Sequence, residues 1–313
     1  MTTVENLAIV DLGSNSTRMA ITRIEDDGSF REVKRVKENT RLSEGMGPEK
    51  KLRKPAMDRT IAAMKRFKQI YTTYPNLTVR CISTAAVRQA SNQQVFLNRV
   101  KQEVGLELQI LSGRQEAYYD YLGVERTLKM DHCLILDVGG ASSELILVQR
   151  KQARDMISLP IGAVNLSEQF KLSGFVRAHD LFRAQSMVTE RLNRIPWLRF
   201  ATRTPIVLLG GANRTLARMA QLRHKQRPHS IHGYKLSHRA VYSLYRDMLG
   251  RNLAQRKKLP GLETDRADII VGGLLPLICL LQRNSDGRVI FSESGVREGI
   301  ITEYIQGRGK RDE

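Results

Sequence analysis

The chain of 313 residues, of which 41% are hydrophobic and 27% charged, is too long for one modest core and suits a globular protein of two domains. Its net charge of +19 is uneven, because residues 1–150 carry 23 basic and 18 acidic side chains whereas residues 151–313 carry 28 and 14. Such a field attracts polyanions such as nucleic acid, anionic membrane or phosphorylated molecules, although a basic soluble protein without such a partner would show the same excess.

The first predicted elements, up to about residue 127, are three strands followed by alternating helices and strands. Apolar runs with β-branched residues lie on either side of a Gly, Ser and Asn cluster, which predicts two strands joined by a tight turn. Apolar residues then recur every three to five positions, which marks the first helix. The predicted strands are 7–13, 16–24, 30–42, 77–84 and 106–112, and the predicted helices are 54–74, 92–105 and 115–127.

The segment that begins at Cys133 opens in the same way. Its predicted strands are 133–140, 144–150, 153–162 and 205–211, and its predicted helices are 177–195, several from Arg214 onward and a buried one at 269–281. Copies of one unit at a period of about 126 residues indicate duplicated domains. We therefore predict an α/β fold of two domains, residues 1–126 and 127–313, each with a mixed sheet.

Three features of the sequence predict a cytoplasmic protein. The start, MTTVEN, lacks the basic and apolar regions of a secretory signal. The apolar run at 269–281 is too short for a membrane span and is broken by Gly-Gly and Pro. The cysteines Cys81, Cys133 and Cys279 lie far apart, so they predict neither a disulfide framework nor a zinc site.

Asp11 and Asp137 each end a buried strand and are followed at once by small polar residues. A buried carboxylate is costly unless something positive compensates for it. Small residues let backbone N–H groups approach an anion, and carboxylates beside such amides make a metal and phosphate site. An ordinary hairpin explains one such turn, but the equivalent pair favours the phosphate site. The candidate phosphate-binding residues are Gly13, Ser14, Asn15, Ser16, Gly139, Gly140, Ala141, Ser142 and Ser143.

A third glycine turn, Gly210-Gly211, joins an apolar strand to a helix in VLLGGANRTLARM. The N-terminus of a helix favours anions, so this turn is a candidate for another phosphate or a nucleotide. Taken alone, the two glycines are better explained by close packing of the strand against the helix.

Nine segments together resemble the exopolyphosphatase and guanosine pentaphosphate phosphohydrolase (Ppx/GppA) family, which belongs to the actin, sugar kinase and Hsp70 superfamily. The resemblance implies two ribonuclease-H-like domains around a central cleft, Mg²⁺-dependent removal of a terminal phosphate, and a glutamate that activates water. It also allows a homodimer, and the last helix, about 297–308, is expected to pack back on the N-terminal domain. The segments are DLGSNSTRM, NTRLSEGM, STAAVRQA, ILSGRQEAYYDYLGV, DVGGASSEL, LPIGAVNLSEQF, LLGGANRTLARM, GLETDRADIIVGG and SGVREGII.

The motifs of the family assign roles to individual residues here. The water-activating glutamate is Glu116 in SGRQEAYY, and the arginine of STAAVRQA is Arg88. The residues that fall where the family handles the metal and the attacking water are Asp11, Asp137 and Glu144. Without the resemblance, Glu116 is better interpreted as a carboxylate that stabilises the N-terminus of a helix.

Two departures from the family bear on activity. The second loop of the family usually carries three glycines, whereas Ala141 stands at the third position here, and its methyl group narrows the approach of phosphate. Longer members carry a C-terminal helical domain that extends the polymer channel, and 313 residues leave no room for it. We therefore expect lower efficiency and less processive action on very long chains.

The function expected from the sequence is the hydrolysis of inorganic polyphosphate or guanosine pentaphosphate with Mg²⁺. Two alternatives stay open, namely an ATP-using kinase of the same fold and a non-catalytic sensor of guanosine tetraphosphate. A nucleic-acid binder is disfavoured, because basic and aromatic residues do not alternate as they do in single-strand binders.

Overall fold

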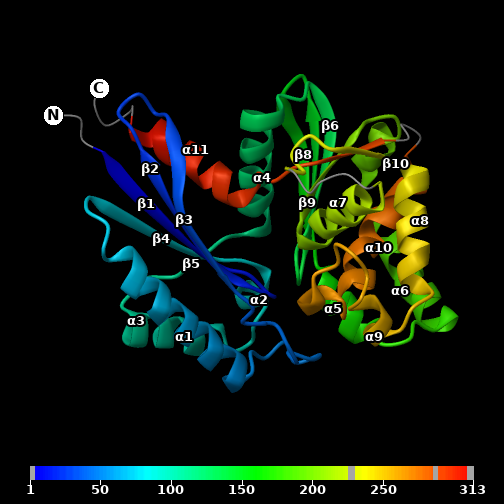
Figure 1. Cartoon of the computed structure of the whole chain (residues 1–313), viewed down its shortest axis with the longest axis horizontal. Coiled ribbons are helices and arrows are strands. Elements are labelled where there is room, and N and C mark those ends of the chain that lie inside the picture. Colours follow the sequence, from blue (N-terminus) through cyan, green and yellow to red (C-terminus); the bar gives the residue numbers. More distant parts are fainter. Residues whose placement is uncertain (1–3, 225–229, 285–287, 309–313) are drawn as a thin grey trace. The chain divides into compact units, whose positions relative to one another are not determined.

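The computed structural model describes residues 4–224, 230–284 and 288–308. Contacts divide the chain into two compact units. Unit 1 comprises Met1–Ser112 with Glu303–Glu313, and unit 2 comprises Gly113–Thr302. Figure 1 shows unit 1 largely in blue and cyan and unit 2 from green to orange.

Unit 1 is built on a five-stranded mixed sheet with the order β3-β2-β1-β4-β5. The first three strands form antiparallel pairs, and β4 and β5 continue the sheet in parallel with β1. The helix α1 has a proline in its first turn, and its apolar face packs on the sheet. The elements are β1 (Glu5–Leu12), β2 (Thr17–Ile24), β3 (Phe30–Glu38), α1 (Lys54–Tyr71), β4 (Leu77–Ser83), α2 (Ala85–Arg88), α3 (Gln93–Val104) and β5 (Gln109–Ile110).

Unit 2 repeats this topology in its six-stranded sheet, whose order is β10-β11-β9-β6-β7-β8. The strands β6, β7 and β8 pair antiparallel, and β9 and β11 run parallel to β6 as β4 and β5 run parallel to β1. The predicted α/β fold with a duplicated mixed sheet is thus confirmed. The strands are β6 (His132–Val138), β7 (Ser143–Gln149), β8 (Gln152–Leu159), β9 (Ile206–Gly210), β10 (Lys235–Ser237) and β11 (Arg288–Phe291).

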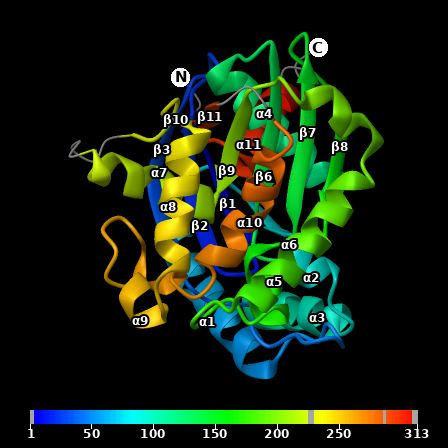
Figure 2. The same cartoon turned by 90° about the vertical axis from the view of Figure 1, so that its right-hand side faces the viewer.

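Helices cover both faces of the sheet in unit 2. The helix α4 covers one face in Figure 1, and Figure 2 shows α6, α8 and α10 in front of the other face. The helix α10 is buried all round, as its apolar sequence predicts. The helical elements are α4 (Gly113–Leu128), α5 (Ala163–Gln169), α6 (Ala178–Asn193), η1 (Pro196–Ala201), α7 (Gly211–Arg223), α8 (His238–Leu249), α9 (Leu253–Arg256), η2 (Thr264–Arg266), α10 (Ile270–Leu281) and α11 (Val296–Arg308).

The two units divide at Ser112/Gly113, whereas the sequence suggested a boundary at 126/127. The difference comes from α4, whose apolar side chains Ala117 and Val124 share a buried cluster with β6 and β7 of unit 2. The helix α11 begins in unit 2 and ends in unit 1, where the Tyr304 hydroxyl hydrogen-bonds to the Glu5 carboxylate. In the described part of the chain, no helix is both long and apolar enough to cross a membrane.

Candidate metal and phosphate site

The turns that follow Asp11 and Asp137 are closed by the same backbone hydrogen bond. The N–H of Gly13 donates to the carbonyl of Ser16 at 3.1 Å, and the N–H of Gly139 donates to that of Ser142 at 2.9 Å. A Cβ on Gly13 would lie 3.0 Å from the carbonyl oxygen of Ser16, and a Cβ on Gly139 would lie 3.2 Å from that of Ser142. Both distances are shorter than most Cβ contacts in proteins. Glycine is therefore needed at the first position of both turns.

A neighbouring loop fixes the first turn through its carbonyl groups. The Ser43 N–H and hydroxyl both donate to the carbonyl of Ser14, at 3.0 and 3.2 Å, and the Arg41 N–H donates to that of Asn15 at 3.0 Å. These bonds hold the backbone of residues 13–16 in place, so that its direction does not depend on a bound ligand.

The second turn is fixed in the same way by the start of α5. The N–H groups of Ala163 and Val164 donate to the carbonyls of Gly139 and Gly140, at 2.9 and 2.8 Å. Ala141 is buried, with 2% of its surface exposed, and a Cβ on Gly162 would overlap its amide. The glycine of LPIGAVN thus allows the loop to seat against the turn.

The strand alternation directs two carboxylates to one face of the sheet in unit 2. Successive side chains of a strand point to opposite faces, and Cys133 and Ile135 of β6 belong to the cluster under α4. Asp137 continues this row, and Glu144 stands directly opposite it on β7. Directly opposite residues of an antiparallel pair lie side by side, so both carboxylates belong to the α4 face.

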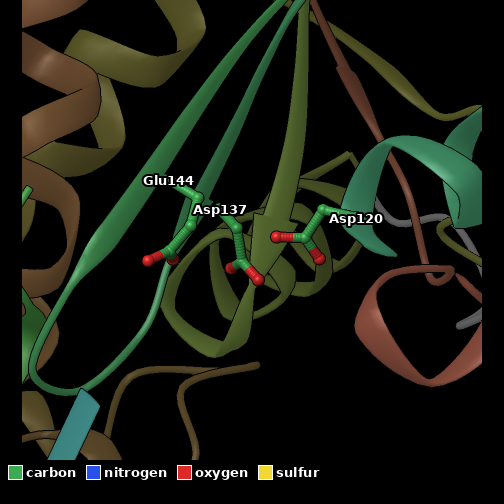
Figure 3. Close-up of side chains that lie close together, drawn as sticks. All are labelled: Asp120, Asp137 and Glu144. Carbon is green, nitrogen blue, oxygen red and sulfur yellow. The ribbon is translucent and has the colours of Figure 1, made fainter. Parts of the chain in front are cut away.

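The helix α4 contributes two further carboxylates to this face. Glu116 lies in its first turn with 5% of its surface exposed, and Asp120 lies one turn later with none. Carboxylate oxygens of Asp120, Asp137 and Glu144 all lie within 4.8 Å of one another, as Figure 3 shows. Sequence reasoning named the second and third but missed Asp120. The spacing of four residues from Glu116 in EAYYD was the signal, since it places both acids on one face of a helix.

Burial and neighbouring acids raise the pKa of Glu144. Burial raises the pKa of Glu144 well above its ordinary value of 4.5, and the charges of Glu116 and Asp137 raise it further. The hydroxyls of Ser158 and Ser142 act in the opposite direction, and that of Ser158 donates to Glu144 Oε1 at 2.7 Å. The interactions that set this pKa include no basic side chain, so a bound cation would supply the missing charge.

The third glycine turn borders the acidic group. Gly210 has a φ of +88°, and a Cβ on it would lie 2.6 Å from Oδ1 of Asp137. A Cβ on Gly211, the first residue of α7, would overlap the guanidinium group of Arg266. The backbone at 210 thus requires glycine, whereas a side chain at 211 would only have to displace the end of Arg266. The role of both glycines as phosphate ligands stays a prediction.

The serine hydroxyls of the second turn are engaged within unit 2. The hydroxyl of Ser142 interacts with Glu144, and that of Ser143 donates to the carbonyl of Ile161 at 2.5 Å. These contacts tie the turn to the acidic group and to the loop before α5.

The remaining predicted residues belong to unit 1. Asp11 ends β1 and faces Arg18 of β2 across the antiparallel pair, at the position that Glu144 occupies in unit 2. Arg88 ends α2, and its Nη1 donates to the carbonyl of Leu111 at 2.6 Å. The acidic group described above consists of residues of unit 2.

Comparison with known proteins identifies relatives that match nearly the whole chain. A model of the Ppx/GppA phosphatase family matches residues 20–307. The bifunctional 3-dehydroquinate synthase/phosphatase of Fusobacterium nucleatum is 27% identical over 320 residues, which cover 96% of this chain and 47% of the relative. A guanosine-5'-triphosphate,3'-diphosphate pyrophosphatase of Vibrio campbellii is 26% identical over 306 residues, which cover 97% of this chain and 60% of the relative. The chain spans about half to three fifths of the length of these curated relatives.

Two solved structures match almost end to end. The Ppx/GppA family member of Aquifex aeolicus is 28% identical, with a TM-score of 0.79 and coverage of 97% of this chain and 99% of that chain. An exopolyphosphatase from Cytophaga hutchinsonii is 24% identical, with a TM-score of 0.88 and coverage of 97% and 98%, and shows the same fold. Because the family model matches most of the residues from one end of the chain to the other, the protein belongs to the Ppx/GppA phosphatase family.

Proposed function

We propose that the protein is a phosphoanhydride hydrolase that removes a terminal phosphate from inorganic polyphosphate or guanosine pentaphosphate with the help of Mg²⁺. The observation that carries the proposal is the group of buried carboxylates beside a glycine turn in unit 2. Its oxygen donors are those that Mg²⁺ prefers. The pyrophosphatase of Vibrio campbellii, a relative over 97% of this chain, supports the class of substrate.

Asp137 and Glu144 would hold Mg²⁺ in this proposal, with Asp11 of unit 1 assisting. The bound ion would neutralise charge on the oxygens of the transferred phosphoryl group. The N–H group of the first glycine in each turn bonds within that turn. The remaining backbone N–H groups of residues 13–16 and 139–143 bind the phosphate oxygens, since small residues let a ligand approach them closely. These contacts orient the terminal phosphate for in-line attack.

Glu116 and Arg88 complete the proposed machinery. Glu116 accepts the proton of the attacking water, which general-base catalysis requires within hydrogen-bond reach of the water. Arg88 offers a forked pair of donors to the phosphoryl group. The bond from Nη1 to the carbonyl of Leu111 holds the guanidinium group in one direction.

The direct test measures phosphate release from each substrate by the purified protein, with Mg²⁺ and with a chelator. We expect release from at least one of the two substrates, without any phosphate acceptor, and loss of release when the metal is removed. Release that required an acceptor would identify a kinase instead. Tight binding of guanosine tetraphosphate without any turnover would identify a sensor.

The compartment and assembly stay part of the proposal. Cys81, Cys133 and Cys279 are buried free thiols, which suits a reducing cytoplasm. The homodimer allowed by the family resemblance stays a prediction, and sedimentation of the purified protein would test it.

A further inference from the structure

The carboxyl group of Asp120 is an unusual feature of α4. It is fully buried, and in the described part of the chain neither of its oxygens has a hydrogen-bond partner of ordinary geometry. An unpaired buried carboxylate is strongly unfavourable, so such a residue needs either a proton or a cation.

The backbone before α11 packs closely against the carboxyl group of Asp120. A Cβ on Gly295 would lie 3.1 Å from Asp120 Oδ1, and a Cβ on Gly123 would lie 2.5 Å from the carbonyl of Gly295. The backbone that leads into α11 therefore closes one side of the carboxyl group. The N–H of Val296 lowers the pKa of Asp120, whereas burial and the charges of the acidic group raise it well above 3.8, and no basic side chain contributes.

The carboxyl group of Asp120 points toward the other two acids of the group, Asp137 and Glu144. Figure 3 shows the carboxyl groups of Asp120 and Glu144 on opposite sides of that of Asp137, and the three come from α4, β7 and β6. Their oxygens lie within 4.8 Å of one another, a separation that one cation can bridge with a small closure of the side chains.

We propose that Asp120 is a third carboxylate ligand of this site, which lets unit 2 hold a divalent cation before any phosphate substrate binds. Mg²⁺ usually binds through one or two carboxylates and completes its shell with water and substrate phosphates. A third carboxylate makes the site more negative, so the protein without substrate binds a divalent cation more tightly. The proposal rests on the proposed function, because it assigns the order in which metal and substrate bind at the same site.

The test measures binding of Mn²⁺, as a paramagnetic substitute for Mg²⁺, to the whole protein without substrate by electron paramagnetic resonance. We expect one ion per chain in the wild type and an affinity at least about tenfold weaker in Asp120→Asn, since even changes to residues that only orient ligands have effects of this size. Asp131→Asn is the matched control, because its carboxylate belongs to unit 2 and is 67% exposed.

Equal Mn²⁺ affinity in Asp120→Asn and the wild type would overturn the proposal, as would a wild type that binds no Mn²⁺ until substrate is added. Thermal melting in the presence of chelator checks that Asp120→Asn is folded. Asn has the shape of Asp without its charge, so the melting temperature of this variant should equal that of the wild type or exceed it. Phosphate release by the wild type is measured separately. Its absence would refute the proposed function, whereas its presence with no metal bound in advance would refute only the role of Asp120.

Discussion

Glu116 and Asp120 share one buried face of α4, but their surroundings differ. Glu116 lies in the first turn, where the partial positive charge of the helix N-terminus stabilises a carboxylate. Asp120 lies in the middle of the helix, where this effect has faded, and its carboxylate needs another source of positive charge. One face of one helix can therefore present a carboxylate suited to accept a proton and another suited to a cation.

Replacing Glu116 by Gln distinguishes catalysis from helix stabilisation. Gln keeps the size but removes the proton acceptor, so a catalytic base predicts a loss of roughly 10² to 10⁴ in kcat with little change in substrate affinity. A carboxylate that only stabilises the helix predicts a loss of about 0.3 to 1 kcal/mol in the free energy of unfolding, with turnover intact. Steady-state kinetics and melting of Glu116→Gln, with Glu125→Gln on the same helix as control, decide between them.

The buried acids also predict how stability depends on pH in the absence of metal. Burial raises the pKa values of Asp120 and Glu144 above their ordinary values of 3.8 and 4.5, so the native protein keeps protons that the unfolded chain releases. The unfolded state then binds fewer protons, and the free energy of unfolding falls as the pH rises above about 4.5.

Denaturant unfolding with chelator between about pH 5 and pH 8 tests this expectation. Histidines also titrate in this range, but their contribution is the same in all variants and cancels when the variants are compared. The wild type should lose stability over this range, and Asp120→Asn should lose less because one raised pKa is gone. Asp131→Asn should behave as the wild type. Identical slopes for Asp120→Asn and the wild type would show that Asp120 does not titrate differently in the two states.

Among the elements, the strands that carry the site were predictable and the short ones were not. Continuous apolar runs ending in Asp marked β1 and β6, and the alternation along β6 and β7 set which face each acid occupies. The predicted strand at 106–112 is only the two-residue β5, because it pairs with just Ile82 and Ser83. The strand β11 was missed, since its four residues depend on pairing with the distant strands β9 and β10.

The crossing of α11 and α4 gives a prediction about these two elements. A Cβ on Gly299 would overlap the backbone of Tyr119, the residue before Asp120, whereas a Cβ on Gly307 of the same helix meets nothing within 4 Å. Gly299→Ala should therefore destabilise the protein by roughly 1 to 3 kcal/mol, as overpacking does. Gly307→Ala should stabilise it by up to about 1 kcal/mol through helix propensity.

Chemical denaturation of both variants measures these changes. Equal stabilities for Gly299→Ala and Gly307→Ala would mean that α11 does not pack against α4 as closely as the structure indicates. A shift of α4 in Gly299→Ala should also weaken Mn²⁺ binding, because Asp120 follows the residue that is displaced.

At the scale of the whole molecule, the sequence shows both the duplication and a difference between its copies. Both units place an Asp near the end of their first strand, and the residue seven positions later is Arg18 in unit 1 but Glu144 in unit 2. The register of the hairpins shows what the sequence does not, namely that each of these residues stands directly opposite its Asp. The acidic partner therefore concentrates negative charge beside Asp137, whereas a basic partner stands opposite Asp11.

The net charge of +19 gives the last prediction, because it acts on the whole molecule at a distance. Residues 151–313 hold 28 basic and 14 acidic side chains, and such a field speeds the capture of an anionic polymer. Salt screens this attraction over about 10 Å at 0.1 M, but screens a buried site much less. The value of kcat/KM for polyphosphate should therefore fall steeply with added KCl at fixed Mg²⁺, while kcat changes less. Steady-state kinetics across a salt series measures both quantities, and a kcat/KM that does not change with salt would show that the basic surface serves another partner.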